Sequence, residues 1–395
     1  MKKNNLLNLG LSLFVGLSLV QGVWAEDADM EKDEGASEEA RTGIYYEYGE
    51  GLRARTAGEE IDLTLNLYNK FKFDVIDTDT ELWGRGNGGK VHIPQSRVVL
   101  DSDFLGGIVN FYGEMDLVGI NYEYRNEYRN KAFIAQEVSL NITPVENVTF
   151  KIGQWYTPFN NESYDYDEFK LNMESASLTG EYFGYFPELG IGVETSFNDY
   201  EFVFGVFNGD NISDRKTEIK TDYKIAAMLS KTIFGEYDRS VSSDINYSKK
   251  AALNVGIYAV YDKGKEKDTG DRYSDRRIGG DIGYKHLGLS TEAGLFFSDV
   301  DVKGGQNFST LGANAKASYF LVPKQFEGVV RLSWLNFRHD ADDARNALEP
   351  AVGLNYYILG ENLRVGTMLS YVSTSYRSDK TTDDLRWLTT LVALF

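Results

Sequence analysis

An acidic, aromatic stretch at residues 158–187 is the part of this 395-residue chain best suited to act on a solute. Only Lys170 opposes its six carboxylates, and carboxylates that line a water-filled passage select ions by sign. Five of these acids are our candidates for such a role: Glu162, Asp165, Asp167, Glu168 and Glu174. Because burying the eight aromatic rings of the stretch is favourable, we expect it to fold inward and narrow a lumen. An external flap that packs on neighbouring loops or on another subunit is the alternative.

A second set of charges lies at alternating positions of the segments around this stretch. The candidates for an inward-facing wall are Lys70, Lys72, Arg97, Glu114, Asp116, Lys151, Arg331 and Arg364. The same alternation turns Arg386, Asp62, Asp74, Asp101 and Glu137 inward. Wall cations opposite an acidic loop would create a transverse field at the narrowest point. For any single wall residue, however, we expect a salt bridge that neutralises a neighbour.

The elements that would carry these charges are long β-strands with one apolar and one polar face. From Ile61 to Val75 apolar and polar residues alternate, and side chains alternate across a strand. Sixteen such segments are predicted, at about 61–76, 91–102, 107–118, 133–143, 146–157, 188–197, 200–208, 221–234, 249–262, 276–285, 288–299, 308–322, 325–338, 347–359, 362–374 and 385–395. This pattern predicts an all-β, antiparallel transmembrane barrel of about sixteen strands. A soluble β-sandwich would have shorter strands and would leave a large apolar surface exposed.

The connections between these segments alternate in length, as they do in outer-membrane barrels. Short ones fall near 103–106, 144–145, 198–199, 287, 323–324 and 360–361. Long polar ones lie at 77–90, 119–132, 158–187, 209–220, 263–275, 300–307, 339–346 and 375–384, so 158–187 is the third external loop. The connection 235–248 should be a short periplasmic turn but is long, which predicts a periplasmic excursion or an error in the count.

The amino-terminal residues divide into three segments ahead of the barrel at 61–395. Two lysines, an apolar run and Val23-Trp24-Ala25 predict a cleaved signal peptide at 1–25. An acidic segment at 26–42 should be disordered in the periplasm. Residues 43–60 are aromatic in part and form either a strand or a periplasmic segment. The final Phe395 resembles the assembly signal of outer-membrane barrels.

Composition argues against several kinds of function. There is no cysteine, so disulfides, thiolate metal sites and cysteine nucleophiles are excluded. The three histidines, His92, His286 and His339, lack metal-site spacing, and we expect no metal and no cofactor. A net charge of −19 makes nucleic acid a poor partner. Acidic surface loops suit an outer leaflet bridged by divalent cations, so outer-membrane lipid and lipopolysaccharide are expected partners.

The phrase KIGQWYTPF at 151–159 resembles the "vGQfktPF" stretch of the phosphate-selective porin family of Gram-negative outer membranes. The segments at 51–71, 95–117, 326–337 and 353–371 resemble other hairpins of that family in the same order. The resemblance implies a sixteen-stranded homotrimer with its third loop folded into the lumen. Phosphate-selective members line the pore with stacked arginines and a lysine cluster. Here only Arg97 remains in the arginine-led hairpin and the third loop is acidic, so we expect this filter to be absent.

The resulting hypothesis is an outer-membrane porin for passive diffusion of small hydrophilic solutes and ions, cation-preferring or weakly selective. A phosphate- or anion-selective porin is one alternative, and a surface adhesin or structural barrel is another. Sixteen strands argue against a mere anchor, because barrels of that size leave an aqueous channel. A barrel enzyme would need a nucleophile with an oriented base. Only His339 with Asp340 and Asp342 approaches one, so no catalytic residue is expected.

Overall fold

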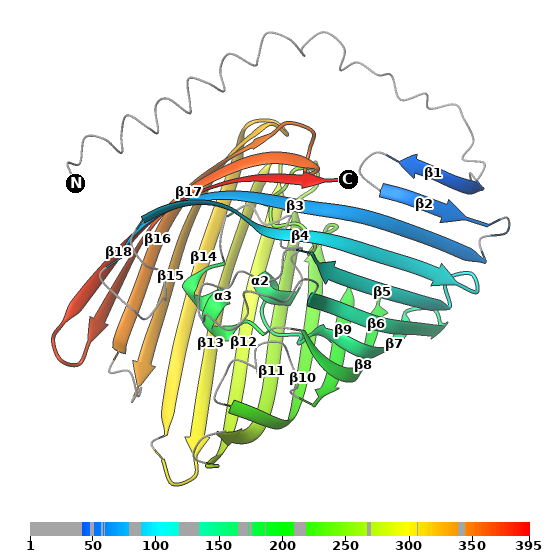
Figure 1. The fold of residues 1–395 in the computed structure, drawn as a ribbon. Coiled ribbons are helices and arrows are strands. Elements are labelled where there is room, and N and C mark those ends of the chain that lie inside the picture. The colour runs from blue at the N-terminus through cyan, green and yellow to red at the C-terminus, as the bar shows by residue number, and fades with distance from the viewer. Residues whose placement is uncertain are drawn as a thin grey trace. The chain divides into compact units, whose positions relative to one another are not determined.

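The protein is described here from a computed structural model (Figure 1). The structure describes residues 42–47, 51–56, 58, 60–78, 88–117, 134–164, 173, 176–185, 187–208, 219–266, 270–305, 307–338 and 344–395. The predicted signal peptide at 1–25 lies outside these residues, as does the predicted acidic segment at 26–42 apart from Thr42.

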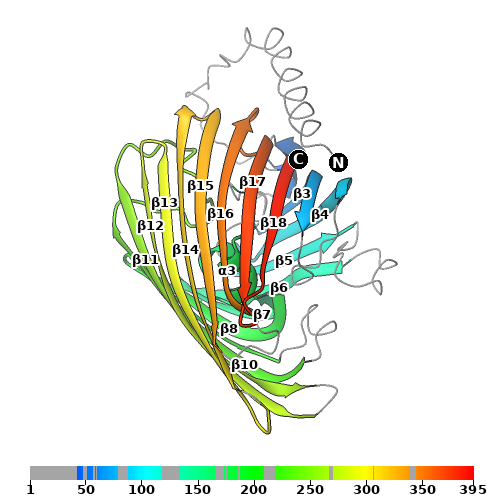
Figure 2. The ribbon, with the colours of Figure 1, turned by 90° about the vertical axis from the view of Figure 1, so that its left-hand side faces the viewer.

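Sixteen antiparallel strands, β3 to β18, form a closed barrel in which each strand pairs with its neighbours in sequence. The first half comprises β3 (Ile61–Thr78), β4 (Gly88–Phe104), β5 (Val109–Asp116), β6 (Ile134–Val145), β7 (Val148–Tyr156), β8 (Pro187–Phe197), β9 (Tyr200–Phe207) and β10 (Ile219–Phe234). The second half comprises β11 (Ala252–Glu266), β12 (Arg272–His286), β13 (Leu289–Val302), β14 (Phe308–Val322), β15 (Phe326–Arg338), β16 (Ala344–Tyr357), β17 (Leu363–Tyr376) and β18 (Thr381–Leu394). Strands β11 to β18 run side by side in Figure 2.

Pairing of β18 with β3 closes the barrel, and the last residue takes part. Phe395 exchanges two backbone hydrogen bonds with Leu67, of 2.8 and 3.0 Å. Closure gives each of the strands β3 to β18 a partner on both sides, which a chain in hydrocarbon requires because no water is present there to satisfy backbone groups.

Alternation of side chains gives the barrel an apolar outside and a polar inside. In β15, Val330 and Leu332 are 55% and 50% exposed, whereas Arg331 between them is 4% exposed. The exposed apolar side chains would contact lipid, and the buried polar ones face the lumen. This arrangement confirms the predicted fold class and the strand count of sixteen.

The predicted strand ends were approximate, and several differ from the observed ones by a few residues. β4 begins at Gly88 rather than 91, β12 at Arg272 rather than 276, and β11 begins at Ala252 rather than 249. Strands that continue past the apolar band lose the alternation of apolar and polar residues but keep their backbone pairing. A pattern of side chains therefore underestimates the length of β4 and β12, whereas it counted residues 249–251 of the preceding connection as part of β11.

Two short strands, β1 (Gly43–Glu47) and β2 (Gly51–Arg55), pair antiparallel with each other. β2 pairs with the first residues of β3, at Asp62 to Leu65, just beyond the part of β3 that pairs with β18. Arg53 and Arg55 both donate to the Asp62 carboxylate. Of the stretch that the sequence left open between strand and periplasmic segment, residues 43–47 and 51–55 are thus strands, and the second of them pairs with the start of β3.

Two short helices lie between β7 and β8: α2 (Asn161–Tyr164) and α3 (Leu178–Phe183). Figure 1 shows both inside the curve of the sheet. Within the described residues, no helix is long and apolar enough to cross a membrane.

Candidate pore constriction

The predicted wall residues all lie at inward positions of their strands. Lys70 and Lys72 flank the exposed Phe71, and Lys151 lies between the exposed Phe150 and Ile152. Arg97, Glu114, Asp116, Arg331 and Arg364 are buried within the barrel. Their placement follows from strand parity, as the sequence indicated.

Three of these wall cations are paired with neighbouring carboxylates. Arg97 Nη1 lies 2.5 Å from Glu114 Oε1, and its Nε lies 3.8 Å from Asp116 Oδ2. Lys151 lies 3.2 Å from Glu194, and Arg331 lies 3.1 Å from Glu349. An arginine whose fork already meets a carboxylate has fewer donors left for a passing anion. The salt-bridge role expected for individual wall residues therefore describes these three residues.

The structure also pairs lumenal cations that we did not single out. Lys224 contacts Glu188 and lies 3.5 Å from Asp262, Arg277 lies 2.7 Å from Asp275, and Lys316 lies 3.4 Å from Glu292. Strand parity alone could have placed them inside. The pairs of Lys224 with Asp262 and of Lys316 with Glu292 depend on which strand positions face one another across the ladder, whereas Arg277 and Asp275 lie two residues apart on the same strand.

An aromatic cluster anchors the loop between β7 and β8 to the inner wall. Phe159 and Phe183 of the loop are fully buried, with ring centroids 6.4 Å apart. Both rings pack against the wall residue Phe296, with centroids at 5.8 and 5.7 Å. Phe159 also contacts the ring of Tyr258 on β11, at 5.8 Å. Pairs of this kind add about 0.5–1.5 kcal/mol each beyond the burial of their surface.

Hydrogen bonds fix the orientation of α3 against the inward residues of β14, β15 and β16. The backbone N–H of Leu178 donates to Glu349 (3.2 Å), and that of Thr179 donates to Ser333 (3.0 Å). The Tyr182 hydroxyl lies 2.7 Å from the Thr310 hydroxyl. The first two bonds satisfy backbone N–H groups at the start of α3, for which the helix itself offers no acceptor.

Glu162 holds the loop together. Its carboxylate accepts hydrogen bonds from the backbone N–H (3.2 Å) and the hydroxyl (2.6 Å) of Ser177, the N-cap residue of α3. Glu162 is buried, so it fixes the two ends of the loop rather than facing a water-filled space. The other candidates of the loop, Asp165, Asp167, Glu168 and Glu174, lie outside the described residues.

Tyr185 follows α3 and lies between two wall cations. Lys224 Nζ lies 4.0 Å from its ring centroid, and the Arg277 guanidinium lies 4.6 Å from it. These cation–π contacts help to position Lys224 and Arg277, which also form ion pairs with Glu188 and Asp275. Burial raises the pKa of Tyr185 well above its ordinary value, so the phenol stays protonated.

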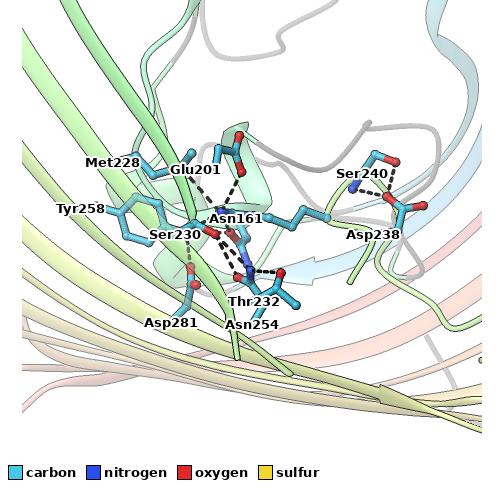
Figure 3. A network of polar contacts seen from close by, with 11 residues as sticks. Asn161, Glu201, Met228, Ser230, Thr232, Asp238, Ser240, Asn254, Tyr258 and Asp281 are labelled. Atoms are coloured by element: carbon cyan, nitrogen blue, oxygen red, sulfur yellow. Dashed lines mark hydrogen bonds and ion pairs between the residues drawn. The ribbon is translucent and has the colours of Figure 1, made fainter. Parts of the chain in front are cut away.

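The connection between β10 and β11 also folds inward, a feature that the sequence did not predict. The strand count at this point is right, and the expected periplasmic excursion is instead a segment packed on the lumenal face. Arg239 Nη2 donates to Asn161 Oδ1 of α2 (2.8 Å) and to the Tyr258 hydroxyl (3.1 Å), while its Nη1 lies 3.4 Å from Glu201. Figure 3 shows Asn161, Tyr258 and Glu201 converging at this point. The periplasmic connection thus contacts the external loop inside the barrel.

Polar contacts along the rest of this connection fix it to the wall. Lys285 donates to the backbone carbonyls of Asp238 (2.7 Å) and Val241 (2.5 Å). The Asp244 carboxylate accepts from the backbone N–H of Gly288 (2.7 Å), at the turn between β12 and β13. That turn packs closely on the connection: a Cβ added at Gly288 would lie 2.5 Å from the Tyr247 ring. A polar segment can be ordered in this way because its backbone groups find partners on the inner wall.

Comparison with known proteins identifies the class. The chain belongs to the family described as phosphate-selective porin O and P, whose sequence profile matches residues 65–393. The protein is therefore an outer-membrane channel for small solutes and not an enzyme. No curated protein sequence matches it.

Several solved structures share the fold at low sequence identity. The outer-membrane channel DcaP of Acinetobacter baumannii is 11% identical, with a TM-score of 0.62 over 86% of this chain and 99% of that chain. The anion-selective porin of Comamonas acidovorans is 12% identical, with a TM-score of 0.58 over 85% and 100%. The trimer form of OmpT of Vibrio cholerae is 10% identical, with a TM-score of 0.56 over 84% and 99%. At these identities the likeness shows the fold.

Proposed function

We propose that this porin is a passive, cation-preferring or weakly selective channel for small hydrophilic solutes. The observation that carries the proposal is the pairing of the lumenal cations Arg97, Lys151, Arg331, Lys224 and Arg277 with carboxylates. A filter for phosphate needs arginine forks that are available to the anion. The excess of carboxylates in the third loop would favour cations.

Three further features belong to the same proposal. The chain is exported by the signal peptide at 1–25 and assembles as a homotrimer in the outer membrane. Lipopolysaccharide and outer-membrane lipid surround it. Support comes from the apolar outer face of the barrel and from the trimeric form of the OmpT structure that shares its fold.

The test is the reversal potential of the purified protein in a planar bilayer under a KCl gradient. We expect a potential whose sign reports cation preference, and a loss of that preference in the triple variant Asp165→Asn, Asp167→Asn, Glu168→Gln. Asp299→Asn is the matched control, since it removes a carboxylate that pairs with the exposed Arg276. Unchanged ion selectivity in the triple variant would show that these three loop carboxylates do not determine the selectivity.

A phosphate- or anion-selective channel is the competing function, and the same bilayer separates the two. An anion-selective channel would reverse the sign of the potential, and millimolar phosphate would block its chloride current. A surface adhesin or structural barrel would give no conductance. Neither outcome is compatible with the proposal.

A further inference from the structure

Three arginines surround an open hollow where β15, β16 and β17 meet the external loops. The hollow has a volume of about 410 Å³ and is lined by Asn336, Phe337, Arg338, Arg345 and Arg377. Arg338 ends β15, Arg345 is the second residue of β16, and Arg377 directly follows β17. All three side chains are exposed.

The backbone register places this hollow at one level of the barrel. Asn336 pairs with Asn346, and Asn346 pairs with Ser375 on the next strand. The two asparagine side chains share a hydrogen bond of 2.6 Å, so they lie on the same face of the sheet. Asn336 alternates with the buried Leu335 and Phe337, which face the lumen, and this face is therefore the outer one.

The outer faces of these strands change from apolar to cationic toward their external ends. β15 presents Val330, Leu332, Trp334, Asn336 and then Arg338, in steps of two residues. On β17, Leu369 and Tyr371 are exposed in the apolar part, and Ser373 and Ser375 follow before Arg377. Aromatic residues followed by polar and basic ones are typical of the boundary between hydrocarbon and headgroups. With the barrel in an outer membrane, this order would place the arginines at the height of the outer-leaflet headgroups.

The charge of this hollow contrasts with the rest of the protein. The chain carries a net charge of −19, and the lumenal arginines described above are paired with carboxylates. Among the residues that the structure describes, no ion pair links Arg338, Arg345 or Arg377 to a carboxylate. Arg276 is a useful contrast, because it is also exposed on the outer face but lies 3.7 Å from Asp299.

We propose that Arg338, Arg345 and Arg377 bind a phosphate group of a phosphorylated glycolipid of the outer leaflet, of the lipid A type. The inference rests on the proposed placement in the outer membrane. A guanidinium group binds phosphate through two parallel hydrogen bonds. Three guanidinium groups around one hollow therefore match the several oxygens of a phosphate group. The apolar surface below, with Trp334, Leu348 and Tyr371, would contact the acyl chains of the same molecule.

The test measures binding of bisphosphorylated lipid A to the folded protein in a zwitterionic detergent by native mass spectrometry. We expect each single Arg→Ala variant to weaken binding about fivefold, and the triple variant about a hundredfold. Arg276→Ala is the matched control and should leave binding unchanged. The triple Arg→Lys variant keeps the charge but not the fork, and should bind between the wild type and the triple alanine variant.

Two further arms identify the source of the phosphate. Lipid A without phosphates should bind as weakly as the triple alanine variant does, and inorganic phosphate should not compete at millimolar concentration. Equal binding of bisphosphorylated lipid A by the wild type and the triple variant would overturn the proposal. Equally tight binding of inorganic phosphate would also overturn it, because the hollow would then be a site for free anions.

Conductance of the same preparations separates this inference from the proposed function. Arg338 and Arg377 continue the outer faces of their strands, and Arg345 is exposed at the register shift between Ala344 and Asn346. The triple variant should therefore conduct like the wild type. A wild-type protein that binds lipid A without conducting would contradict the proposed channel and leave the lipid site standing. A protein that conducts but shows no preference for phosphorylated lipid A would contradict the lipid site and leave the proposed channel standing.

Discussion

The external loop between β7 and β8 and the periplasmic connection between β10 and β11 both fold into the barrel, but with different contacts. The loop is anchored mainly by the rings of Phe159 and Phe183, which are fully buried against Phe296. The connection is anchored by hydrogen bonds and charges, among them those of Arg239 and Asp244. The two segments meet where Arg239 donates to Asn161.

This difference has energetic consequences. Burial of aromatic surface is non-directional and large, at about 25 cal/mol per Å². A hydrogen bond contributes only about 0.5–1.5 kcal/mol net, yet leaving a buried partner unsatisfied costs more. The aromatic loop should therefore hold its position strongly, and the polar connection should depend on every partner being present.

The largest effect is expected when a ring of the aromatic anchor is removed. Phe183→Ala deletes its contacts with Phe159, Phe296 and Tyr182 and leaves a cavity, at a cost of about 3–5 kcal/mol. The loop should detach, so single-channel conductance should rise and the folded protein should become sensitive to protease. Phe183→Leu, which keeps much of the volume, should retain both wild-type properties. An alanine variant with wild-type conductance and protease resistance would refute the aromatic anchor.

An intermediate effect is expected at the polar contact beneath α3. Glu349→Ala removes the acceptor of the Leu178 N–H and leaves Arg331 buried without that partner, at a cost of about 3 kcal/mol. The urea midpoint of unfolding in detergent should fall. Adding Arg331→Met should recover part of the loss, because the uncompensated charge is then removed. If the double variant is as unstable as the single one, the penalty does not come from the buried charge.

The smallest of the three effects is expected at the junction of the two segments. Arg239→Ala removes the donor to Asn161 and Tyr258, at a cost of about 1–3 kcal/mol. Backbone amides of residues 237–248 should exchange hydrogen faster, while those of the barrel strands stay protected. Arg239→Lys keeps the charge but cannot reach both acceptors with a planar fork, so it should give intermediate exchange. Wild-type exchange in the alanine variant would show that the connection is held without this contact.

Much of the barrel could be predicted from the sequence, because alternation is a local property. Arg331 between Val330 and Leu332, or Lys151 between Phe150 and Ile152, shows the inward face without knowledge of any neighbouring strand. The aromatic composition of 158–187 likewise indicated a packed loop, and Phe159 and Phe183 are buried as that reasoning required. The acidic character of the constriction stays a prediction.

Pairings between distant strands could not be predicted in this way. Nothing in the sequence around Arg239 indicates that its hydrogen-bond partner is Asn161, which precedes it by 78 residues. The sequence predicted only a periplasmic excursion or an error in the count at 235–248. The partners of this connection lie on other elements, such as Lys285 of β12 and Gly288 in the turn that follows it. The same holds for Arg338, Arg345 and Arg377, which three separate strand ends bring to one hollow.

The order of residues along each strand, by itself, determined a cylinder with an apolar outside and a polar inside, since side-chain direction follows from position in the strand. Only the closed barrel decided which charges neutralise one another and which segments enter the lumen. Those outcomes depend on strand register and on distances across the lumen, which no local pattern of residues contains.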